Sequence, residues 1–314
     1  MALNSLSFNT KLTGELDKAL IQESKTGFLA DNNMRAKFVG ARNVLIPDLE
    51  MQGLGDYNRD DGFATGTLTI SSQSYTLSMD RGRQFQIDRE DEDETGVANL
   101  AGQVLGEFVR TKVAPEMDAY ALSTLATTAS GQSHTITGTP STEAYKMLTE
   151  AINEVQDAVG FSTSEPLVAF VNSSFWADLM GTDEVTRMLT VGDFKKGEIN
   201  TRVKMLNDVP IIPVNDGRMK TAYTFYDGVT DNSGSSGANE KAGGFVPASG
   251  AKNIGFLVLP KRAASLVKKS ETIRTFSPEQ NQKADAYLFQ YRLYYDLFVR
   301  NSYKDTIYVY QYTA

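Results

Sequence analysis

Cysteine and histidine, two residue types that often carry catalysis, are scarce in this chain of 314 residues. It has no cysteine and a single histidine, His134, which lies in a polar stretch over residues 130–135. The lack of cysteine excludes disulfides and thiolate nucleophiles, and the chain cannot supply the four Cys or His ligands of a structural zinc site. Histidine is the usual general base near neutral pH. A lone histidine among serine, threonine and glycine is more typical of a surface residue than of a catalytic one.

Other patterns that could support chemistry are weak as well. Gly53-x-Gly55 lacks the preceding strand, third glycine and following helix of a phosphate-binding loop. The acidic run 88–94 could hold calcium, but calcium loops alternate their ligands around a glycine, so an acidic helix start is favoured. A β-rich hydrolase with paired carboxylates is the enzyme alternative, and no two carboxylates can be placed at a defined separation. We expect no catalytic, cofactor-binding or metal-binding residues.

The charge and hydropathy patterns exclude several further classes of protein function. The net charge of −8 argues against a nucleic-acid reader, which would present a basic face. The pairs Lys261-Arg262 and Lys268-Lys269 are too few for such a face. No apolar run approaches the roughly 20 residues that span a bilayer, and the first residues do not resemble a signal peptide. The apolar fraction of 41% suffices for a packed core.

Strand patterns dominate residues 44–87. A short apolar run at 44–47 precedes a glycine-rich polar segment at 50–66, and residues 67–71 and 75–87 alternate with a period of two. Two-stranded hairpins alone are marginally stable in water, so the apolar face of the second strand needs a partner surface. We therefore expect inter-subunit contacts from the residues on that face, which are Tyr75, Leu77, Met79, Arg81, Arg83 and Phe85. We further expect Arg81 and Arg83 to form salt bridges with a neighbour, for example with its acids at 88–94.

Helical patterns lie on either side of this segment. Residues 95–126 match one long amphipathic helix, with Pro115 kinking or breaking it. Residues 1–43 contain a short amphipathic stretch, interrupted at Gly27, that fits either an arm ordered against a neighbour or a helix on its own domain.

The rest of the chain alternates helices and strands. A helix stripe at 145–159 precedes a buried strand at 166–171, and Asn172 is placed to cap the next helix. Residues 228–244 are polar and glycine-rich, which predicts a long surface loop. A buried strand at 254–260 and a long aromatic strand at 284–299 follow.

This order of parts resembles the major capsid proteins of tailed phages with the HK97-type fold. The resemblance covers nearly the whole chain, and the segment Phe108-Val-Arg-x-x-Val-Ala-Pro-Glu-x-Asp118 is typical of one phage group. It implies an α+β fold with an N-terminal arm (1–43) and an extended β-hairpin loop (44–90). A peripheral domain with a long spine helix and long strands (91–130 and 262–300) and an axial α/β domain (131–261 and 301–314) would follow.

The resemblance also implies a function and partners. The chain would be a non-enzymatic virion protein, assembled in the host cytoplasm, that forms pentamers and hexamers of an icosahedral shell. The shell would enclose double-stranded DNA without sequence-specific binding and without a membrane, with scaffolding, portal and decoration proteins as possible partners. We expect no scaffolding region before the arm, and crosslinking residues cannot be matched. An encapsulin-like shell around cargo protein, or another phage virion protein, is the alternative.

Overall fold

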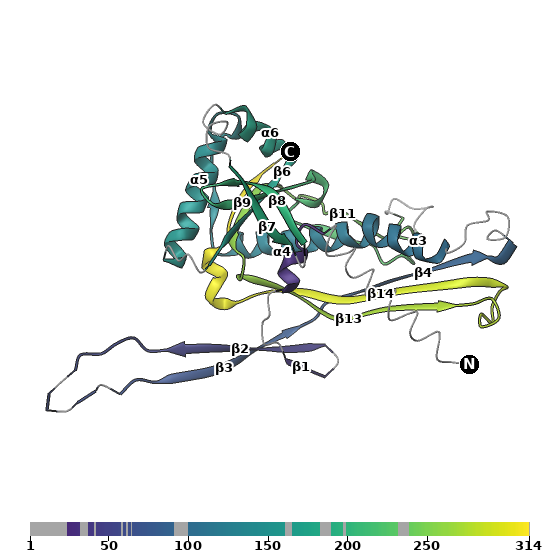
Figure 1. Cartoon of the computed structure of the whole chain (residues 1–314), viewed down its shortest axis with the longest axis horizontal. Helices are drawn as coiled ribbons and strands as arrows, with labels where there is room; N and C mark the ends of the chain where they lie inside the picture. Colours follow the sequence, from purple (N-terminus) through teal and green to yellow (C-terminus); the bar gives the residue numbers. More distant parts are fainter. Residues whose placement is uncertain are drawn as a thin grey trace.

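In the computed structural model of this chain, the described residues form four β-sheets, and one long helical segment lies between two of them (Figure 1). The structure describes residues 24–31, 37–40, 42–57, 59–60, 62–63, 65–90, 100–160, 165–182, 190–196, 199–231 and 239–313. The acids at 91–94, most of the expected N-terminal arm and part of the loop 228–244 lie outside these ranges. Among the described residues, no helix is both long and apolar enough to cross a membrane.

A seven-stranded mixed sheet forms the upper part of the molecule. Its strand order is β5 (Thr135–Ile136), β15 (Tyr308–Tyr312), β12 (Asn253–Pro260), β6 (Leu167–Asn172), β9 (Val209–Val214), β8 (Ile199–Leu206) and β7 (Thr190–Lys196). The strands β6 and β12 are buried almost throughout, as expected for strands covered on both faces. One face packs against α5 (Pro140–Val159) and α6 (Ser173–Gly181), and the other packs against the long helical segment. Asn172 caps α6 as predicted, because its side chain accepts a hydrogen bond of 2.7 Å from the Phe175 amide.

The long helical segment comprises α3 (Leu100–Phe108), the π-helical turn η2 (Val109–Val113) and α4 (Ala114–Gly131). The expected break at Pro115 does not occur. Pro115 lies in the first turn of α4, and the wider π turn immediately before it carries the helical path onward. In this turn the Ala114 amide bonds to the Val109 carbonyl oxygen, so the helical path continues up to the proline, which itself donates no hydrogen bond. The described helix ends at Gly131 rather than at 126.

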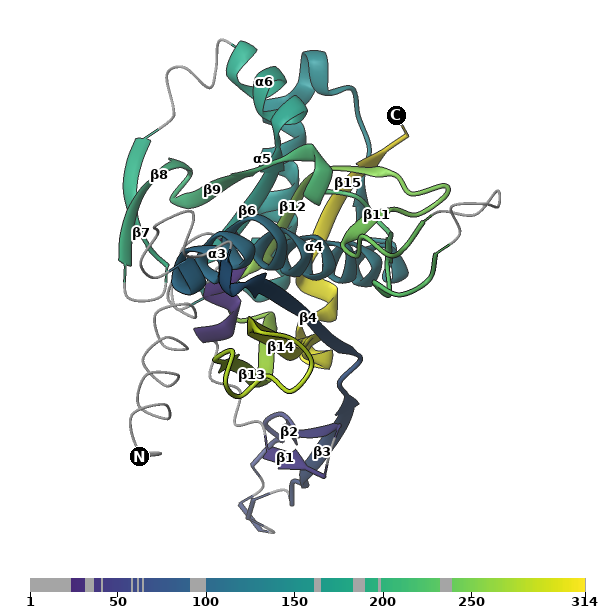
Figure 2. The same ribbon diagram turned by 90° about the vertical axis from the view of Figure 1, so that its right-hand side faces the viewer.

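A sheet of long strands underlies this helix. Strand β14 (Ala286–Val299) lies between β13 (Ala264–Phe276) and β4 (Met79–Asp88), and all pairs are antiparallel. Figure 2 shows α3 and α4 between this sheet and the seven-stranded sheet. The predicted aromatic strand at 284–299 is therefore confirmed to within two residues at its start. Its aromatic side chains pack against the helix in the main core.

A β-hairpin extends from one side of the molecule (Figure 1). Strand β2 (Asn43–Met51) pairs with β3 (Leu68–Thr76) along its whole length, and β1 (Lys37–Val39) pairs with the start of β2. The expected loop 44–90 therefore needs correction. The hairpin ends at Thr76, and residues 79–88 belong to the long-strand sheet because β4 pairs with β14. The other domain boundaries stay predictions.

Residues 24–31 are built into the core of their own subunit. The 3-10 turn η1 (Gly27–Asp31) buries Phe28 and Leu29 completely, and the Phe28 ring stacks on that of Phe170 at 5.9 Å. The amphipathic stretch that carries the two alternatives, an arm or a helix on its own domain, lies outside the described residues, so both stay predictions. The remaining elements are β10 (Tyr223–Phe225), β11 (Phe245–Pro247), η3 (Asp216–Arg218) and η4 (Asn301–Thr306).

Candidate functional site: the hairpin, its base and the Asp118 node

The hairpin exposes most of the large apolar side chains that the described residues leave in solvent. Leu54 is fully exposed and Phe63 is 88% exposed. Outside the hairpin sheet, the described residues expose only Val229 to a comparable degree. The other exposed apolar side chains of the hairpin and its β1 strand are those of Phe38, Val39, Met51, Tyr57, Leu68 and Ile70. An exposed apolar surface of this size is typical of an interaction site.

The base of the hairpin is anchored by a small apolar cluster. Leu77 is 2% exposed and packs with Val44, Ile46, Tyr294 and Phe298. The Leu77 amide donates to the Arg42 carbonyl oxygen at 2.8 Å. These contacts join β2, the residues after β3, and β14, so that the hairpin leaves the subunit from a fixed base.

A buried carboxylate, Asp296, fixes Ser78 in the two-residue link between β3 and β4. Its Oδ2 accepts hydrogen bonds from the amide and hydroxyl of Ser78 at 2.8 and 2.9 Å. Its Oδ1 accepts from the Tyr120 hydroxyl at 2.5 Å and from the Leu297 amide at 2.7 Å. Burial and this hydrogen bond raise the pKa of Tyr120 to about 12. The sequence signal for Asp296 is an acid inside an otherwise aromatic strand.

Of the six side chains predicted to contact a neighbour, Met79, Arg81, Arg83 and Phe85 lie on one face of β4, as the period-two pattern indicates. Tyr75 lies in β3, and Leu77 lies between the two strands. The face of β4 points into the same chain, because Met79 and Phe85 pack against the main core, and Leu77 is buried as well. The Phe85 and Phe108 rings meet edge to face at 4.9 Å, and the Tyr75 ring lies 4.8 Å from that of Phe298. The premise that this face needs another subunit is therefore wrong, because α3, α4 and β14 cover it. Contact of these six residues with a neighbour stays a prediction.

The two arginines of this face also have partners in their own chain. Arg81 Nε forms an ion pair of 2.6 Å with Glu116 on α4, and its Nη1 donates to the Tyr226 carbonyl at 2.8 Å. Both terminal nitrogens of Arg83 donate to the Lys241 carbonyl oxygen at 3.3 Å. The arginines thereby hold the loop that connects β10 and β11 onto β4. Sequence reasoning missed this because the carbonyl acceptors are far away along the chain.

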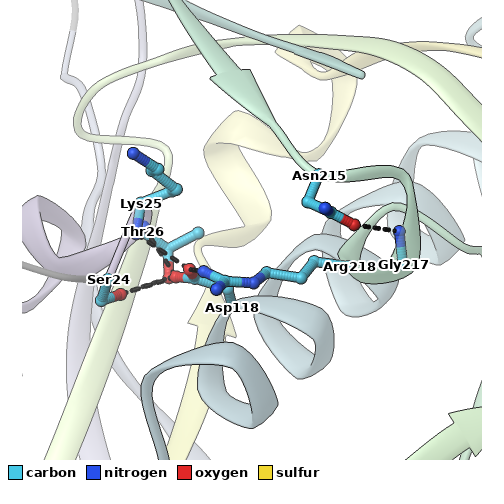
Figure 3. Close-up of polar contacts among 7 residues, drawn as sticks. All are labelled: Ser24, Lys25, Thr26, Asp118, Asn215, Gly217 and Arg218. Carbon is cyan, nitrogen blue, oxygen red and sulfur yellow. Dashed lines mark hydrogen bonds and ion pairs between the residues drawn. The ribbon is translucent and has the colours of Figure 1, made fainter. Parts of the chain in front are cut away.

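The carboxylate of Asp118 is fully buried on α4 and joins three distant segments (Figure 3). Its Oδ1 accepts from the Ser24 hydroxyl at 2.6 Å, the Thr26 amide at 2.9 Å and the Thr26 hydroxyl at 2.8 Å. Its Oδ2 accepts from the Lys25 amide at 2.9 Å and forms an ion pair of 3.0 Å with Arg218. We call these five residues the Asp118 node. Since five donors satisfy the carboxylate, the node is structural.

Arg218 is itself held by the short η3 turn. The Asn215 side chain accepts a hydrogen bond of 2.8 Å from the Gly217 amide (Figure 3). Asp216 accepts from the Ser173 amide at 3.0 Å, at the start of α6. The node therefore connects residues 24–26, the long helix and the seven-stranded sheet. In the sequence analysis, Asp118 was named only as the last residue of the segment that carries the family resemblance, and no role was predicted for it.

The structure gives no chemical role to His134. Its ring stacks on Tyr308 with 4.6 Å between centroids, and the residue is half-buried rather than fully exposed. Within the described ranges, no group of three or more His, Asp or Glu side chains could hold a metal ion.

Comparisons with known proteins match the fold rather than the sequence. No family model matches this sequence, and no curated protein is significantly similar to it. The capsid of cyanophage P-SCSP1u matches with a TM-score of 0.55 at 11% identity, covering 88% of this chain and 86% of that one. The mature capsid of bacteriophage PhiM1 matches with a TM-score of 0.54 at 11% identity, covering 86% and 82%. The chain has the HK97-type capsid fold.

A virus-like particle from Pyrococcus furiosus shares this HK97-type fold. It matches with a TM-score of 0.52 at 10% identity, covering 96% of this chain and 99% of that one. At 10–11% identity, these matches show a shared fold. The α+β architecture with one long helix and several sheets is the expected one.

Proposed function

We propose that this chain is a major capsid protein that self-assembles into an icosahedral shell around phage double-stranded DNA. The observation that carries the proposal is the uncovered hairpin of an HK97-type fold. Its apolar side chains are exposed in the single subunit, and a second copy is the surface that we propose covers them. The virion is then where the protein resides.

The size of this surface suits reversible assembly. Burying one large apolar side chain stabilises by about 1.5–3 kcal/mol, so the six most exposed hairpin side chains supply roughly 9–18 kcal/mol. Association costs about 4–15 kcal/mol in lost freedom of motion. Because the two ranges overlap, the stability of a shell does not have to come from a single contact, and a closed shell repeats the contact in many symmetric copies.

The contact between copies is head to tail. The hairpin of one copy meets a different surface of the next, and such heterologous contacts generate rings when the rotation closes. Pentamers and hexamers are rings of this kind. The net charge of −8 fits a container that encloses DNA without gripping it. Scaffolding, portal and decoration proteins are the further partners of such a shell.

An encapsulin-like shell around cargo protein is the second candidate. The observation in its favour is the match to the Pyrococcus furiosus virus-like particle, which covers a larger share of both chains than the phage capsids do. The two candidates share self-assembly and differ in their contents. Another phage virion protein with this fold remains the third alternative.

Electron microscopy of the purified chain and of native particles tests the proposal. The pure protein should form rings or closed shells in negative stain, and native particles should show regularly spaced layers of duplex DNA. Shells that hold folded protein and no DNA would favour the second candidate. Monomers at all concentrations would refute both.

A truncated hairpin identifies the assembly element. Replacing residues 52–67 by Asn-Gly, a two-residue turn that suits antiparallel strands, should leave a folded subunit that forms no shell. Val229→Ser is the matched control, because it removes an exposed apolar side chain outside the hairpin sheet and should leave assembly unchanged. Normal shells from the truncated protein would contradict the role of the hairpin.

A further inference from the structure

A pocket of about 400 Å³ lies between β4, β14, the long helical segment and the loop that connects β10 to β11. Small-molecule sites in proteins typically have volumes of about 300–1,000 Å³. The loop is held on β4 because Arg81 donates to the Tyr226 carbonyl oxygen and Arg83 donates to that of Lys241. Contacts within one subunit therefore hold the walls of the pocket in place.

The floor of the pocket is aromatic. The centroid of the Phe108 ring lies 4.9 Å from that of Phe85 and 5.8 Å from that of Tyr291, in edge-to-face contacts. Tyr291 is buried, whereas Phe85 and Phe108 are half-buried and line the pocket. Since aromatic rings favour further edge-to-face or offset-stacked neighbours, this floor suits a ligand that contains an aromatic ring.

The wall that the loop forms is made largely of backbone. Gly228, Gly243 and Gly244 line the pocket, together with Ala242. Gly228 and Gly243 have φ angles of 76° and 69°, in the left-handed region that residues with a side chain disfavour. A Cβ atom added at Gly228 would also lie 2.8 Å from Nη1 of Arg83. Glycine therefore allows the loop to approach Arg83 closely, and its flat peptide groups suit a planar ligand.

The charges that line the pocket balance one another. Three acidic and three basic side chains line it, namely those of Asp80, Glu116, Asp227, Arg81, Arg83 and Lys112. Glu116 forms an ion pair with Arg81, and Asp80 forms one with Arg292, which does not line the pocket. A charged ligand would lose hydration on entering and would meet no excess of opposite charge. The pocket is therefore suited to an uncharged molecule.

A buried hydroxyl at this pocket lacks a hydrogen-bond partner. Tyr295 lines the pocket and is only 2% exposed. Its hydroxyl makes no hydrogen bond with any residue that the structure describes. Burial, as the largest cause, raises the pKa of Tyr295 well above its usual value, so the hydroxyl stays protonated and can donate. Because buried polar groups nearly always have a partner, an acceptor on a ligand would complete the hydrogen bonding of this residue.

We propose that this pocket binds an uncharged, planar aromatic molecule whose carbonyl oxygen or ring nitrogen accepts a hydrogen bond from the Tyr295 hydroxyl. The aromatic floor and the backbone wall account for the flat ring. The balanced charges account for the lack of a net charge on the ligand. Tyr295 accounts for the acceptor, and we call the site the Tyr295 pocket.

The Tyr295 pocket goes beyond the proposed shell function and does not depend on it, because every residue that forms the pocket belongs to one subunit. A bound molecule would contact β4, the long helical segment and the loop at the same time. Binding to the folded chain alone stabilises it by mass action, so the melting temperature should rise with ligand concentration. Sequence reasoning predicted no such site, because the elements that form it are far apart along the chain.

Four one-ring molecules test this chemistry in ligand-observed NMR titrations of the full-length chain. Benzamide carries a ring and a carbonyl acceptor without charge, toluene lacks the acceptor, and benzoate and benzylammonium are charged. Benzamide should bind most tightly and should raise the melting temperature. Because a neutral hydrogen bond is lost, Tyr295→Phe should raise the Kd for benzamide about 2- to 12-fold. The Kd for toluene should not change, since toluene makes no hydrogen bond with Tyr295.

The matched control is Tyr308→Phe, which removes a hydroxyl outside the pocket and should leave every Kd unchanged. If Tyr295→Phe does not fold, Ala242→Trp replaces it, because a large ring at this exposed lining position should fill the pocket and exclude benzamide. Weaker benzamide binding in these variants and not in the control supports the inference. Unchanged benzamide binding, tighter binding of either charged molecule, or no saturable binding of any of the four overturns it, and none of these results affects the proposed shell function.

Discussion

Replacing Asp118 by asparagine should destabilise the subunit strongly, although it changes only one atom. An amide keeps one acceptor oxygen, which can retain the three hydrogen bonds from Ser24 and Thr26. The amide nitrogen then faces the N–H groups of Lys25 and Arg218, where Oδ2 accepted two hydrogen bonds. Two donors therefore lose their acceptor, and the new NH₂ group meets other donors.

The expected loss follows from the burial of the node. A hydrogen bond to a charged group contributes about 1.5–3 kcal/mol, and removing one member of a buried ion pair costs roughly 3–5 kcal/mol. Arg218 is 26% exposed, so water compensates part of its loss. We expect the free energy of unfolding to fall by about 3–5 kcal/mol, a large share of the roughly 5–15 kcal/mol typical of a domain.

Urea unfolding of the unassembled subunit measures this loss, and limited trypsin digestion locates it. Cleavage after Lys25 should accelerate, because the node holds the backbone of residues 24–26. The control is Glu107→Gln, which breaks an exposed pair of 2.8 Å with Arg110 and should cost only about 0–1 kcal/mol. The reasoning fails if Asp118→Asn costs no more than this control, or if the cleavage rate after Lys25 does not change.

Three further changes probe the hairpin base and its surroundings. Leu77→Ala should lower the free energy of unfolding by about 2–5 kcal/mol in urea titrations, because the side chain is 2% exposed; a loss below about 1 kcal/mol would mean that the cluster does not anchor the hairpin. The pKa of Tyr120 is raised to about 12, and its neutral hydroxyl donates a hydrogen bond to Asp296. The stability that this group contributes is therefore complete below pH 10 and is lost as the pH rises from 10 to about 12. In Tyr120→Phe, the melting temperature should fall less steeply between pH 10 and about 12 than in the wild type. An unchanged slope in this range would show that Tyr120 does not cause the loss of stability. Arg81→Met leaves Glu116 without its cation and should speed hydrogen exchange in the loop that Arg81 holds, whereas unchanged exchange would show that the loop is held by other contacts.

Periodicity in the sequence predicted which side chains share a face but not what covers that face. The alternation from Tyr75 to Phe85 predicted six residues on one side of one strand. In the structure, Met79, Arg81, Arg83 and Phe85 share one side of β4, whereas Tyr75 belongs to β3 and Leu77 lies between the two strands. The cover comes from Phe108, Glu116 and β14, which are up to about two hundred residues away in the chain. A single sequence does not show such pairings, so a second subunit was the nearest explanation.

The sequence also did not predict the partners of buried polar groups. Asp118 interrupts an apolar helical stripe at one position, and nothing nearby in the sequence shows that its donors are Ser24, Thr26 and Arg218. Pro115 illustrates the opposite case, in which a local rule predicted a kink or break and a π turn absorbed it. The order of the helices and strands, and the strands predicted from long apolar runs, were predicted correctly because such patterns reflect burial over many residues.

The pairing of β4 with β14 also sets the order in which the molecule is completed during synthesis. Residue 88 pairs with residue 286, so the long-strand sheet cannot close until almost the whole chain has left the ribosome. The strands β2 and β3 pair within residues 43–76, but a two-stranded hairpin alone is marginally stable in water. Its base packs on Tyr294 and Phe298 of β14, so the hairpin gains its anchor only after that strand has been made. A finished subunit is therefore the first form of the chain that presents the hairpin from a fixed base.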